Sequence, residues 1–126
     1  MRRVPAALVV DDNAINRRLL ESILRRIGWQ ASLCENGAAA LAALGQCSFD
    51  LVLLDLRMPD VGGAEICRRI RNELNLTALP VIAYTAHGML EDRARMLAEG
   101  FSGLLIKPVS FADVRGICEE FGPVLS

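Results

Sequence analysis

The amino-acid sequence predicts an α/β fold, a doubly wound parallel sheet of five strands with five helices. Short apolar runs of strand type alternate with helical patterns from one end of the chain to the other, and the connections between them are short. Right-handed crossovers then leave few arrangements other than a parallel sheet with helices on both faces. With 126 residues and no linker or internal repeat, we expect a single domain over residues 1–126.

Five apolar runs predict the strands. They lie at residues 6–10, 30–34, 50–54, 80–84 and 103–106, with the sequences AALVV, QASLC, DLVLL, PVIAY and GLLI. The third run leads directly into Asp55, so a carboxylate follows large apolar residues at a place where the burial of a charge is costly.

The first helix is predicted to end at Ile27 and to begin near Ile15. Apolar residues recur there at the helical period on one face, which we expect to face the core: Ile15, Leu19, Leu20, Ile23, Leu24 and Ile27. Glu21 and Arg25 are paired one turn apart on the other face.

Four further helices are predicted at residues 36–46, 63–74, 89–99 and 111–121. Gly100 is expected to end the third of these, and Ser110 is expected to cap the fourth.

The composition is typical of a soluble globular protein, with 52 % hydrophobic and 23 % charged residues. No apolar run approaches the ~18 residues that indicate a membrane span. Two arginines and a short apolar run near the start are similar to the beginning of a signal peptide, but Asp11 and Asp12 follow with no small-residue cleavage site. We therefore expect a cytoplasmic protein without membrane contact.

The four cysteines, Cys34, Cys47, Cys67 and Cys118, form no CxxC pair and have no metal-ligand spacing. Reduced and mostly buried thiols are expected.

The formal net charge of −1 gives no general attraction to nucleic acid. Arginines cluster on the polar sides of helical patterns, at Arg17–Arg18, Arg25–Arg26 and Arg68–Arg69–Arg71. We interpret these clusters as solvated helix faces and expect no direct binding of nucleic acid.

Polar side chains stand where four of the predicted strands end. Asp11 and Asp12 follow the first strand, Asp55 the third, Thr85 the fourth and Lys107 the fifth. The carboxyl ends of parallel strands meet at one edge of the sheet, which is where ligands bind in such folds. Three converging carboxylates repel one another unless a cation holds them ionised, so a divalent metal is implied, and Mg²⁺ favours such an all-oxygen set.

Lys107 is the only lysine beside thirteen arginines. It faces the acids and precedes Pro108, whose peptide bond could be cis and so aim the ammonium inward. The compact charge of a lysine ammonium suits the binding of a phosphate. The alternative is that the genome favours arginine codons and that one lysine remains here by chance. Thr85 similarly has two interpretations, as a hydroxyl donor to a phosphoryl oxygen or as a helix cap.

Four motifs in this order and spacing, VVDDNAINR, LVLLDLRMPDVGG, VIAYTA and LLIKPV, resemble the receiver domain of two-component response regulators over essentially the whole chain. The stretch DDNAINRRLL further resembles receivers that are attached to hybrid histidine kinases or work in phosphorelays. The resemblance implies a single receiver domain over residues 1–126, with the flavodoxin-like strand order 2-1-3-4-5.

The resemblance also implies a chemistry. Asp55 would accept a phosphoryl group from a phosphohistidine, and Asp12 and Asp55 would hold Mg²⁺ directly, together with the backbone carbonyl of Arg57. Asp11 would act through water. Lys107 would pair with Asp55 and then with the phosphate, to which Thr85 would also turn.

The partner would be a histidine kinase or a histidine phosphotransfer protein. The chain would be a phosphoacceptor that assists its own phosphorylation and dephosphorylation rather than an enzyme, and we expect a monomer. We expect the partner to dock on the start of the first helix, near Asn16 and Arg18, and on residues 107–109. His87 and Arg57 occupy positions that flank the incoming water in this family; each has an equal alternative as an exposed loop side chain.

Three alternative functions differ from this one in the residues that they require. A flavin-binding module of this fold needs a hydroxyl- and glycine-rich phosphate loop after the first strand, where this chain has acids. A phosphatase similar to haloacid dehalogenases needs a second acid two residues after Asp55, where Arg57 stands. A receiver-like interaction module that is not phosphorylated remains as the alternative function.

One position departs from the family pattern. Many receivers carry a tyrosine or phenylalanine three residues before the strand-5 lysine, and here that residue is Leu104. We therefore expect phosphorylation to order Thr85 and the loop through Gly88 without a large change on the face made by the last two helices and the last strand, which would suit an intermediate carrier in a relay. The alternative is that Leu104 packs under the helix at residues 89–99 and that another residue, such as Tyr84, does the switching.

Overall fold

A five-stranded parallel sheet forms the centre of the computed structural model, which describes residues 4–58, 60–86 and 90–123. The strand order is β2-β1-β3-β4-β5, and every neighbouring pair is parallel. The doubly wound α/β fold and its order are therefore confirmed. The strands are β1 (Ala6–Val10), β2 (Gln30–Cys34), β3 (Leu51–Asp55), β4 (Val81–Thr85) and β5 (Gly103–Ile106).

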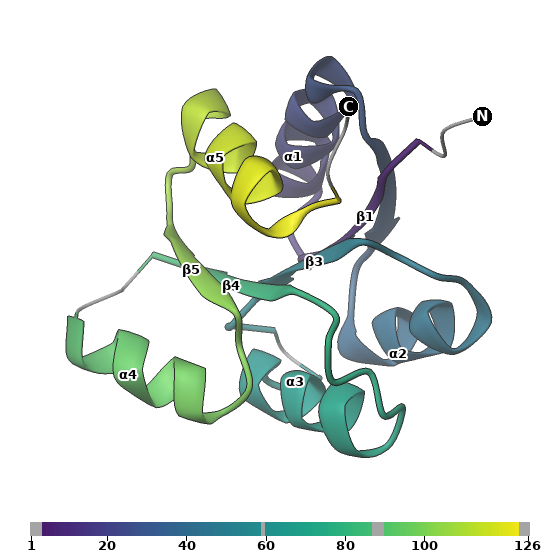
Figure 1. The fold of residues 1–126 in the computed structure, drawn as a ribbon, viewed down its shortest axis with the longest axis vertical. Helices are drawn as coiled ribbons and strands as arrows, with labels where there is room; N and C mark the ends of the chain where they lie inside the picture. The colour runs from purple at the N-terminus through teal and green to yellow at the C-terminus, as the bar shows by residue number, and fades with distance from the viewer. Residues whose placement is uncertain (1–3, 59, 87–89, 124–126) are drawn as a thin grey trace.

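Helices cover both faces of the sheet (Figure 1). They are α1 (Ala14–Ile27), α2 (Gly37–Gln46), α3 (Gly63–Asn72), α4 (Leu90–Ala98) and α5 (Phe111–Phe121). Helices α1 and α5 pack on one face, and α2, α3 and α4 pack on the other. Each face has its own core cluster, and the sheet separates the two.

Strand β3 shows why the apolar runs are continuous rather than alternating. All of its residues are buried. Leu51 and Leu53 belong to the cluster under α1 and α5, whereas Val52 and Leu54 belong to the cluster under α2, α3 and α4. A central strand of a parallel sheet is buried on both faces, so both sets of alternating side chains must be apolar.

The element ends agree with the sequence to within one or two residues. Ser110 caps α5, since its side chain accepts from the Asp113 N–H and the Asp113 carboxylate accepts from the Ser110 N–H. Gly100, with φ of 106°, follows α4 as expected. Asp55 and Thr85, expected just after their strands, are instead the last residues of β3 and β4. Each strand therefore carries its polar side chain to the edge of the sheet.

The start of α1 differs from the expected pattern. Leu20, Ile23 and Leu24 are buried, but Ile15 is 78 % exposed and Leu19 is 45 % exposed. Both lie in the first two turns of α1, after the loop that follows β1. The expectation that they face the core is wrong, and Leu19 instead lines a hollow together with Tyr84 and Lys107.

Arg71 also differs, because its guanidinium is not part of a solvated face. It donates to the carbonyl oxygens of Gly100 (3.0 Å from Nε and 2.7 Å from Nη2), Leu76 (2.7 Å) and Leu79 (2.6 Å), and to Ser102 Oγ at 3.4 Å. These acceptors lie in the segment before β4 and in the turn before β5. Arg71 thus fastens α3 to the amino ends of two strands.

The cysteines are free, but only two of them are buried, Cys67 and Cys118. Burial raises the pKa of Cys118 to about 12, and burial also raises the pKa of Cys67 and of the half-buried Cys34. Cys47 is exposed at the end of α2, so the expectation of mostly buried thiols holds for half of them. None of the described helices combines the length and apolar character that a membrane crossing requires.

Replacing Arg71 by alanine should lower the free energy of unfolding by about 3 kcal/mol, because several part-buried carbonyls lose a charged donor at once. Urea unfolding followed by circular dichroism measures the change. Arg68→Ala is the matched control on the same helix: the Arg68 side chain is 63 % exposed and is paired only with Glu65 among the interactions of the described residues, so its loss should cost about 0.5 kcal/mol or less. Equal losses in the two variants would contradict the role of Arg71.

Candidate functional site

Three carboxylates meet at the carboxyl edge of the sheet. Asp11 and Asp12 follow β1, Asp55 ends the neighbouring strand β3, and one oxygen from each lies within 4.8 Å of the others. Asp11 and Asp55 are buried, and Asp12 is exposed. Within the part of the chain that the structure describes, no other group of histidines, cysteines or acids comes together in this way.

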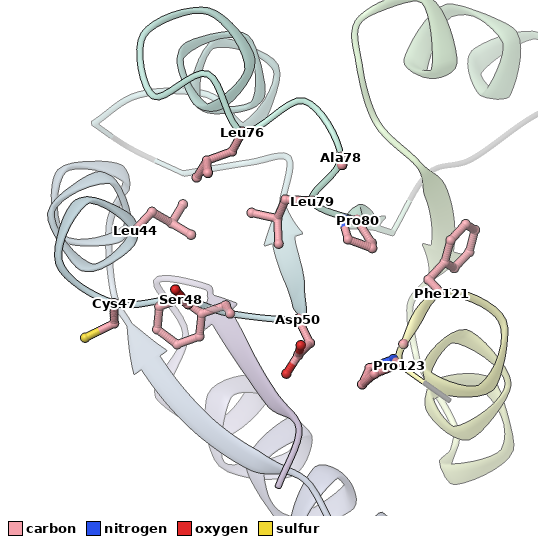
Figure 2. A pocket seen from close by; sticks show the side chains of 12 residues that line it. Leu44, Cys47, Ser48, Asp50, Leu76, Ala78, Leu79, Pro80, Phe121 and Pro123 are labelled. Carbon is pink, nitrogen blue, oxygen red and sulfur yellow. The ribbon is translucent and has the colours of Figure 1, made fainter. Parts of the chain in front are cut away.

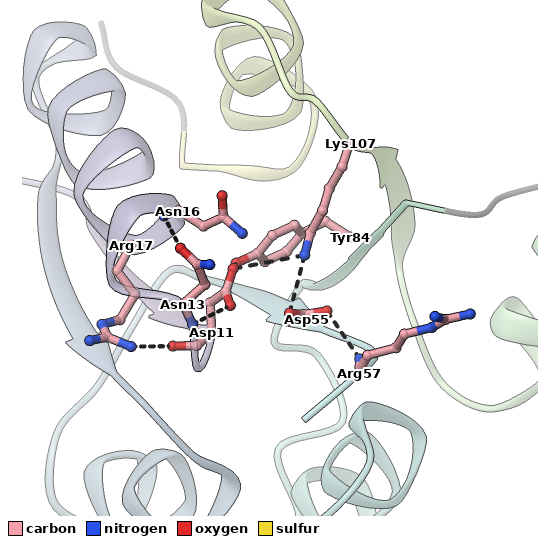
Figure 3. A network of polar contacts seen from close by, with 8 residues as sticks. All are labelled: Asp11, Asn13, Asn16, Arg17, Asp55, Arg57, Tyr84 and Lys107. Atoms are coloured by element: carbon pink, nitrogen blue, oxygen red, sulfur yellow. Dashed lines mark hydrogen bonds and ion pairs between the residues drawn. The ribbon is translucent and has the colours of Figure 1, made fainter. Parts of the chain in front are cut away.

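Lys107 lies between the two buried acids (Figure 3). Its Nζ donates to Asp55 Oδ2 at 3.2 Å and stands 3.9 Å from Asp11 Oδ2. The other Asp55 oxygen, Oδ1, accepts from the backbone N–H of Arg57 at 3.0 Å. The site thus contains three acids and one ammonium.

The pKa values of the two buried acids, Asp11 and Asp55, are shifted in opposite directions. Burial raises the pKa of Asp55 and the charge of Asp11 adds to this, while the Arg57 N–H and Lys107 oppose it without cancelling it. Burial also acts to raise the pKa of Asp11, but the hydrogen bonds from Tyr84 and the Asn13 N–H, with the charge of Lys107, outweigh it and the pKa falls. Of the two buried acids, Asp55 is therefore the one whose negative charge is less well compensated. A cation placed among the acids would hold it ionised.

Tyr84 is a member of the site that the sequence interpretation missed. It is 1 % exposed, its hydroxyl donates to Asp11 Oδ2, and its ring centroid lies 4.8 Å from Lys107 Nζ. The signal was present in the sequence, because a tyrosine beside the polar end of a buried strand needs a partner for its hydroxyl. The sequence interpretation considered Tyr84 only as a strand residue and as an alternative switch residue, and it did not predict the contact with Asp11.

Asn13 in the β1–α1 loop and Arg17 in the first turn of α1 fix the position of Asp11. The Asn13 N–H donates to Asp11 Oδ1 at 2.8 Å, and the Asn13 side chain caps α1 by accepting from the Asn16 N–H at 3.0 Å. Arg17 Nη1 donates to the Asp11 carbonyl oxygen at 2.6 Å. Arg17, expected on a solvated face, is therefore half-buried and structural.

The remaining expected site residues lie at the same edge. Thr85 is buried, and its carbonyl oxygen accepts from the Lys107 N–H at 2.8 Å. The Lys107–Pro108 peptide bond is cis. The Arg57 side chain is exposed and points away from the acids (Figure 3). His87 lies outside the described residues.

The acids fit a magnesium ion. Asp11, Asp12 and Asp55 offer only carboxylate oxygens, with no nitrogen or sulfur ligand among the described residues of the group. Hard divalent cations take such oxygen sets, whereas softer metals favour imidazole or thiolate. The donor chemistry agrees with the metal inferred from the sequence.

A hollow of about 480 Å³ lies at the opposite end of the strands from the three acids (Figure 2). Leu44, Phe49, Leu79 and other mostly uncharged residues line it, and the single charged one is Asp50. The Asp50 carboxylate accepts from the Ala6 N–H at 2.8 Å, so it serves the local backbone. That hollow lacks the clustered charges of the acid edge and is not the candidate site.

Residues 7–119 match the family model of the response regulator receiver domain. The chain belongs to this family. As a receiver domain it is a phosphoacceptor module of two-component phosphorelays rather than a classical enzyme, and its group of three acids is like the magnesium site of receivers.

Relatives with similar sequences include a sensor protein and a sensor histidine kinase. The receiver domain is 39 % identical over 111 residues to the sensor protein GacS of Pseudomonas syringae pv. syringae, an alignment that covers 86 % of this chain and 12 % of GacS. It is 44 % identical over 108 residues to the sensor histidine kinase RcsC of Escherichia coli strain K12, covering 86 % of this chain and 11 % of RcsC. The chain thus spans only a small part of these curated relatives.

Solved structures show the same fold. The chemotaxis protein CheY4 of Vibrio cholerae superposes with a TM-score of 0.88 at 24 % identity, covering 94 % of this chain and 99 % of that one. The receiver domain of the sensor histidine kinase PA1611 of Pseudomonas aeruginosa PAO1 has a TM-score of 0.85 at 30 % identity, covering 94 % and 98 %. That structure holds a magnesium ion coordinated in its active-site cleft.

Tyr84 is the single tyrosine of the chain, so its ionisation can be followed by ultraviolet absorbance without overlap from another phenol. Burial, then the hydrogen bond and charge of Asp11, raise its pKa well above the ordinary value. The folded protein should therefore show no phenolate absorbance as the pH passes about 10, the ordinary pKa of tyrosine, whereas the urea-unfolded chain should. Because the unfolded chain loses this proton first, stability should fall as the pH rises above that value. A phenolate signal from the folded protein near pH 10 would contradict the burial of this hydroxyl.

Proposed function

We propose that Asp55 is the residue that accepts the phosphoryl group, from a phosphohistidine of a histidine kinase or a histidine phosphotransfer protein. The observation that carries this proposal is the position of Asp55, a buried carboxylate between two further acids and the Lys107 ammonium, which is 3.2 Å away. In the transfer, a bond forms between an Asp55 oxygen and phosphorus as the bond from phosphorus to the imidazole nitrogen breaks. The nitrogen keeps the electron pair of the broken bond.

The other residues of the site would position and neutralise charge. Asp12 and Asp55, with the carbonyl oxygen of Arg57, would hold Mg²⁺, and Asp11 would act through water. When bound, Mg²⁺ supplies positive charge that offsets the phosphoryl oxygens. Lys107 would exchange its pairing with the Asp55 carboxylate for one with the phosphoryl group, and the Thr85 hydroxyl would donate to the same group.

The partner would dock beside the acids, on a rim formed by the start of α1 and residues 107–109. A hollow of about 280 Å³ lies there, lined by Asn16, Leu19, Tyr84, Lys107 and their neighbours. Leu19 lines this hollow, and Ile15 lies one helical turn earlier on α1. Both are exposed apolar side chains, and exposed apolar groups beside a polar site favour a protein partner. Docking at this rim would bring a donor imidazole to Asp55.

The wider setting follows the relatives. We propose that residues 1–126 form one receiver domain, that it is a monomer in the cytoplasm, and that it works with a hybrid histidine kinase as a donor or as its parent protein. Similarity to the receivers of sensor kinases such as GacS and RcsC supports this setting. The alternative, an interaction module that is not phosphorylated, would leave the Asp55–Lys107 pair without a chemical role.

Asp55→Asn should abolish labelling by acetyl phosphate in the presence of Mg²⁺, because an amide cannot form the acyl phosphate. The label on the unchanged protein should be lost in alkali and hydroxylamine, as expected for an acyl phosphate. Asp50→Asn is the matched control, since Asp50 lies at the amino end of the same strand and should leave labelling intact. Undiminished labelling of Asp55→Asn would show a different acceptor, and an unlabelled natural protein would favour the interaction module.

Ile15→Gln should slow phosphoryl transfer from a phosphohistidine donor by about tenfold, because it would remove an exposed apolar contact from the proposed docking surface, and a few such contacts often carry most of the binding energy. Transfer from acetyl phosphate, which needs no docking, should be unchanged. The control Leu97→Gln changes an exposed apolar residue of α4, 53 % exposed, and should affect neither donor. Equal slowing with both donors would place the effect of Ile15 in the chemistry rather than in docking.

A further inference from the structure

We propose that Tyr84 is a positioning residue of the phosphoacceptor site, which holds Asp11 in the orientation needed for magnesium and supports Lys107 on its path to Asp55. The inference rests on the proposed function and adds a residue to it. It begins from the place of Tyr84 on β4, the strand that lies between β3, which carries Asp55, and β5, which leads to Lys107.

The hydroxyl of Tyr84 completes the set of donors around Asp11. Asp11 Oδ1 accepts from the Asn13 N–H, and Asp11 Oδ2 accepts from the Tyr84 hydroxyl. With a donor on each oxygen, the carboxylate cannot rotate without breaking a buried hydrogen bond. Each oxygen keeps a second acceptor position, so these bonds orient the group without removing it from the site.

The ring of Tyr84 lies under Lys107. Neighbouring strands are about 4.8 Å apart, so a side chain that starts after β5 must cross β4, a distance of roughly 10 Å, to reach an acid on β3. The Lys107 ammonium makes that crossing above the Tyr84 ring, 4.8 Å from its centroid, and reaches Asp55 Oδ2 at 3.2 Å. An aromatic face attracts a cation at this distance, so the ring guides the ammonium.

A purely structural role does not explain the hydroxyl. Tyr84 belongs to the core cluster under α1 and α5, where a phenylalanine would fill the same space. Burying a hydroxyl costs free energy unless it is hydrogen-bonded, and this one is bonded to the acid of the site.

Tyr84→Phe tests the proposal, since it removes the hydroxyl and keeps the ring. The Mg²⁺ dissociation constant of the unphosphorylated protein, measured by titration calorimetry, should rise on the order of tenfold, as expected for the loss of a donor to a charged group. The Mg²⁺ concentration that gives half the maximal rate with acetyl phosphate should rise by the same factor. The rate at saturating Mg²⁺ should stay within about twofold of the unchanged protein, because Tyr84 does not touch the reacting atoms.

Two comparisons separate positioning from stability. Ile82→Val shortens a buried side chain two residues earlier on the same strand and in the same cluster, and should lower stability without changing Mg²⁺ affinity. In an Asp11→Asn background, Tyr84→Phe should have no further effect on Mg²⁺ affinity, because its target carboxylate is already gone.

Unchanged Mg²⁺ affinity in Tyr84→Phe, or an equal change in Ile82→Val, would overturn the proposal. A fall in the rate at saturating Mg²⁺ would also overturn it, by placing Tyr84 at the reacting atoms. These results differ from a failure of the proposed function, in which the unchanged protein itself would neither bind Mg²⁺ nor take up a phosphoryl group on Asp55.

Discussion

The structure depends on one group of ion pairs that spans four strands, from β1 to β5, in which the Lys107 ammonium is paired with the buried carboxylates of Asp11 and Asp55. Two adjacent buried acids would repel each other and cost free energy if nothing compensated them. The strand order determines how compensation is possible: β1 and β3 are neighbours, so their acids meet, while β5 is separated from β3 by β4. Only a long side chain reaches across β4, and Lys107 does so at 3.2 Å from Asp55.

The fold and the convergence of the acids could be predicted because both follow from the order of residues along each strand. Apolar runs locate buried strands, and the polar residue at the end of each run then lies at a known edge. The missed features depend on tertiary distance. Nothing in the sequence near Arg71 shows that carbonyls of residues 76, 79 and 100 surround it, and the helical period cannot show that Ile15 is exposed at the start of α1.

The alternation of side chains along β4 and β5 divides the two faces of the sheet between different tasks. Tyr84 points to the side of α1 and α5, where it lines the hollow at the proposed docking rim. Leu104 packs on the opposite side, with the cluster under α2, α3 and α4. Tyr84 therefore cannot replace an aromatic residue at position 104, and a change at Lys107 would reach the α1 rim through Tyr84 more directly than the α4 face. That direction suits a carrier that exchanges phosphoryl groups at the rim.

This division between faces requires the register of β4 and β5 to be correct, since a slip of one residue would move each side chain to the other face. The register is set at the far end of the strands. The Ser102 N–H donates to the Val81 carbonyl oxygen at 2.8 Å, and the Val81 N–H donates to Ser102 Oγ at 3.1 Å. Arg71 holds the same turn through the Gly100 carbonyl oxygen. From this anchor Tyr84 pairs with Leu105 and Thr85 with Ile106, so the next residue, Lys107, emerges beside Tyr84 and above the acids. The hydrogen bonds of Arg71 thus contribute to the chemistry of a site that Arg71 does not touch, because they help to fix which side chains of β4 and β5 lie at that site.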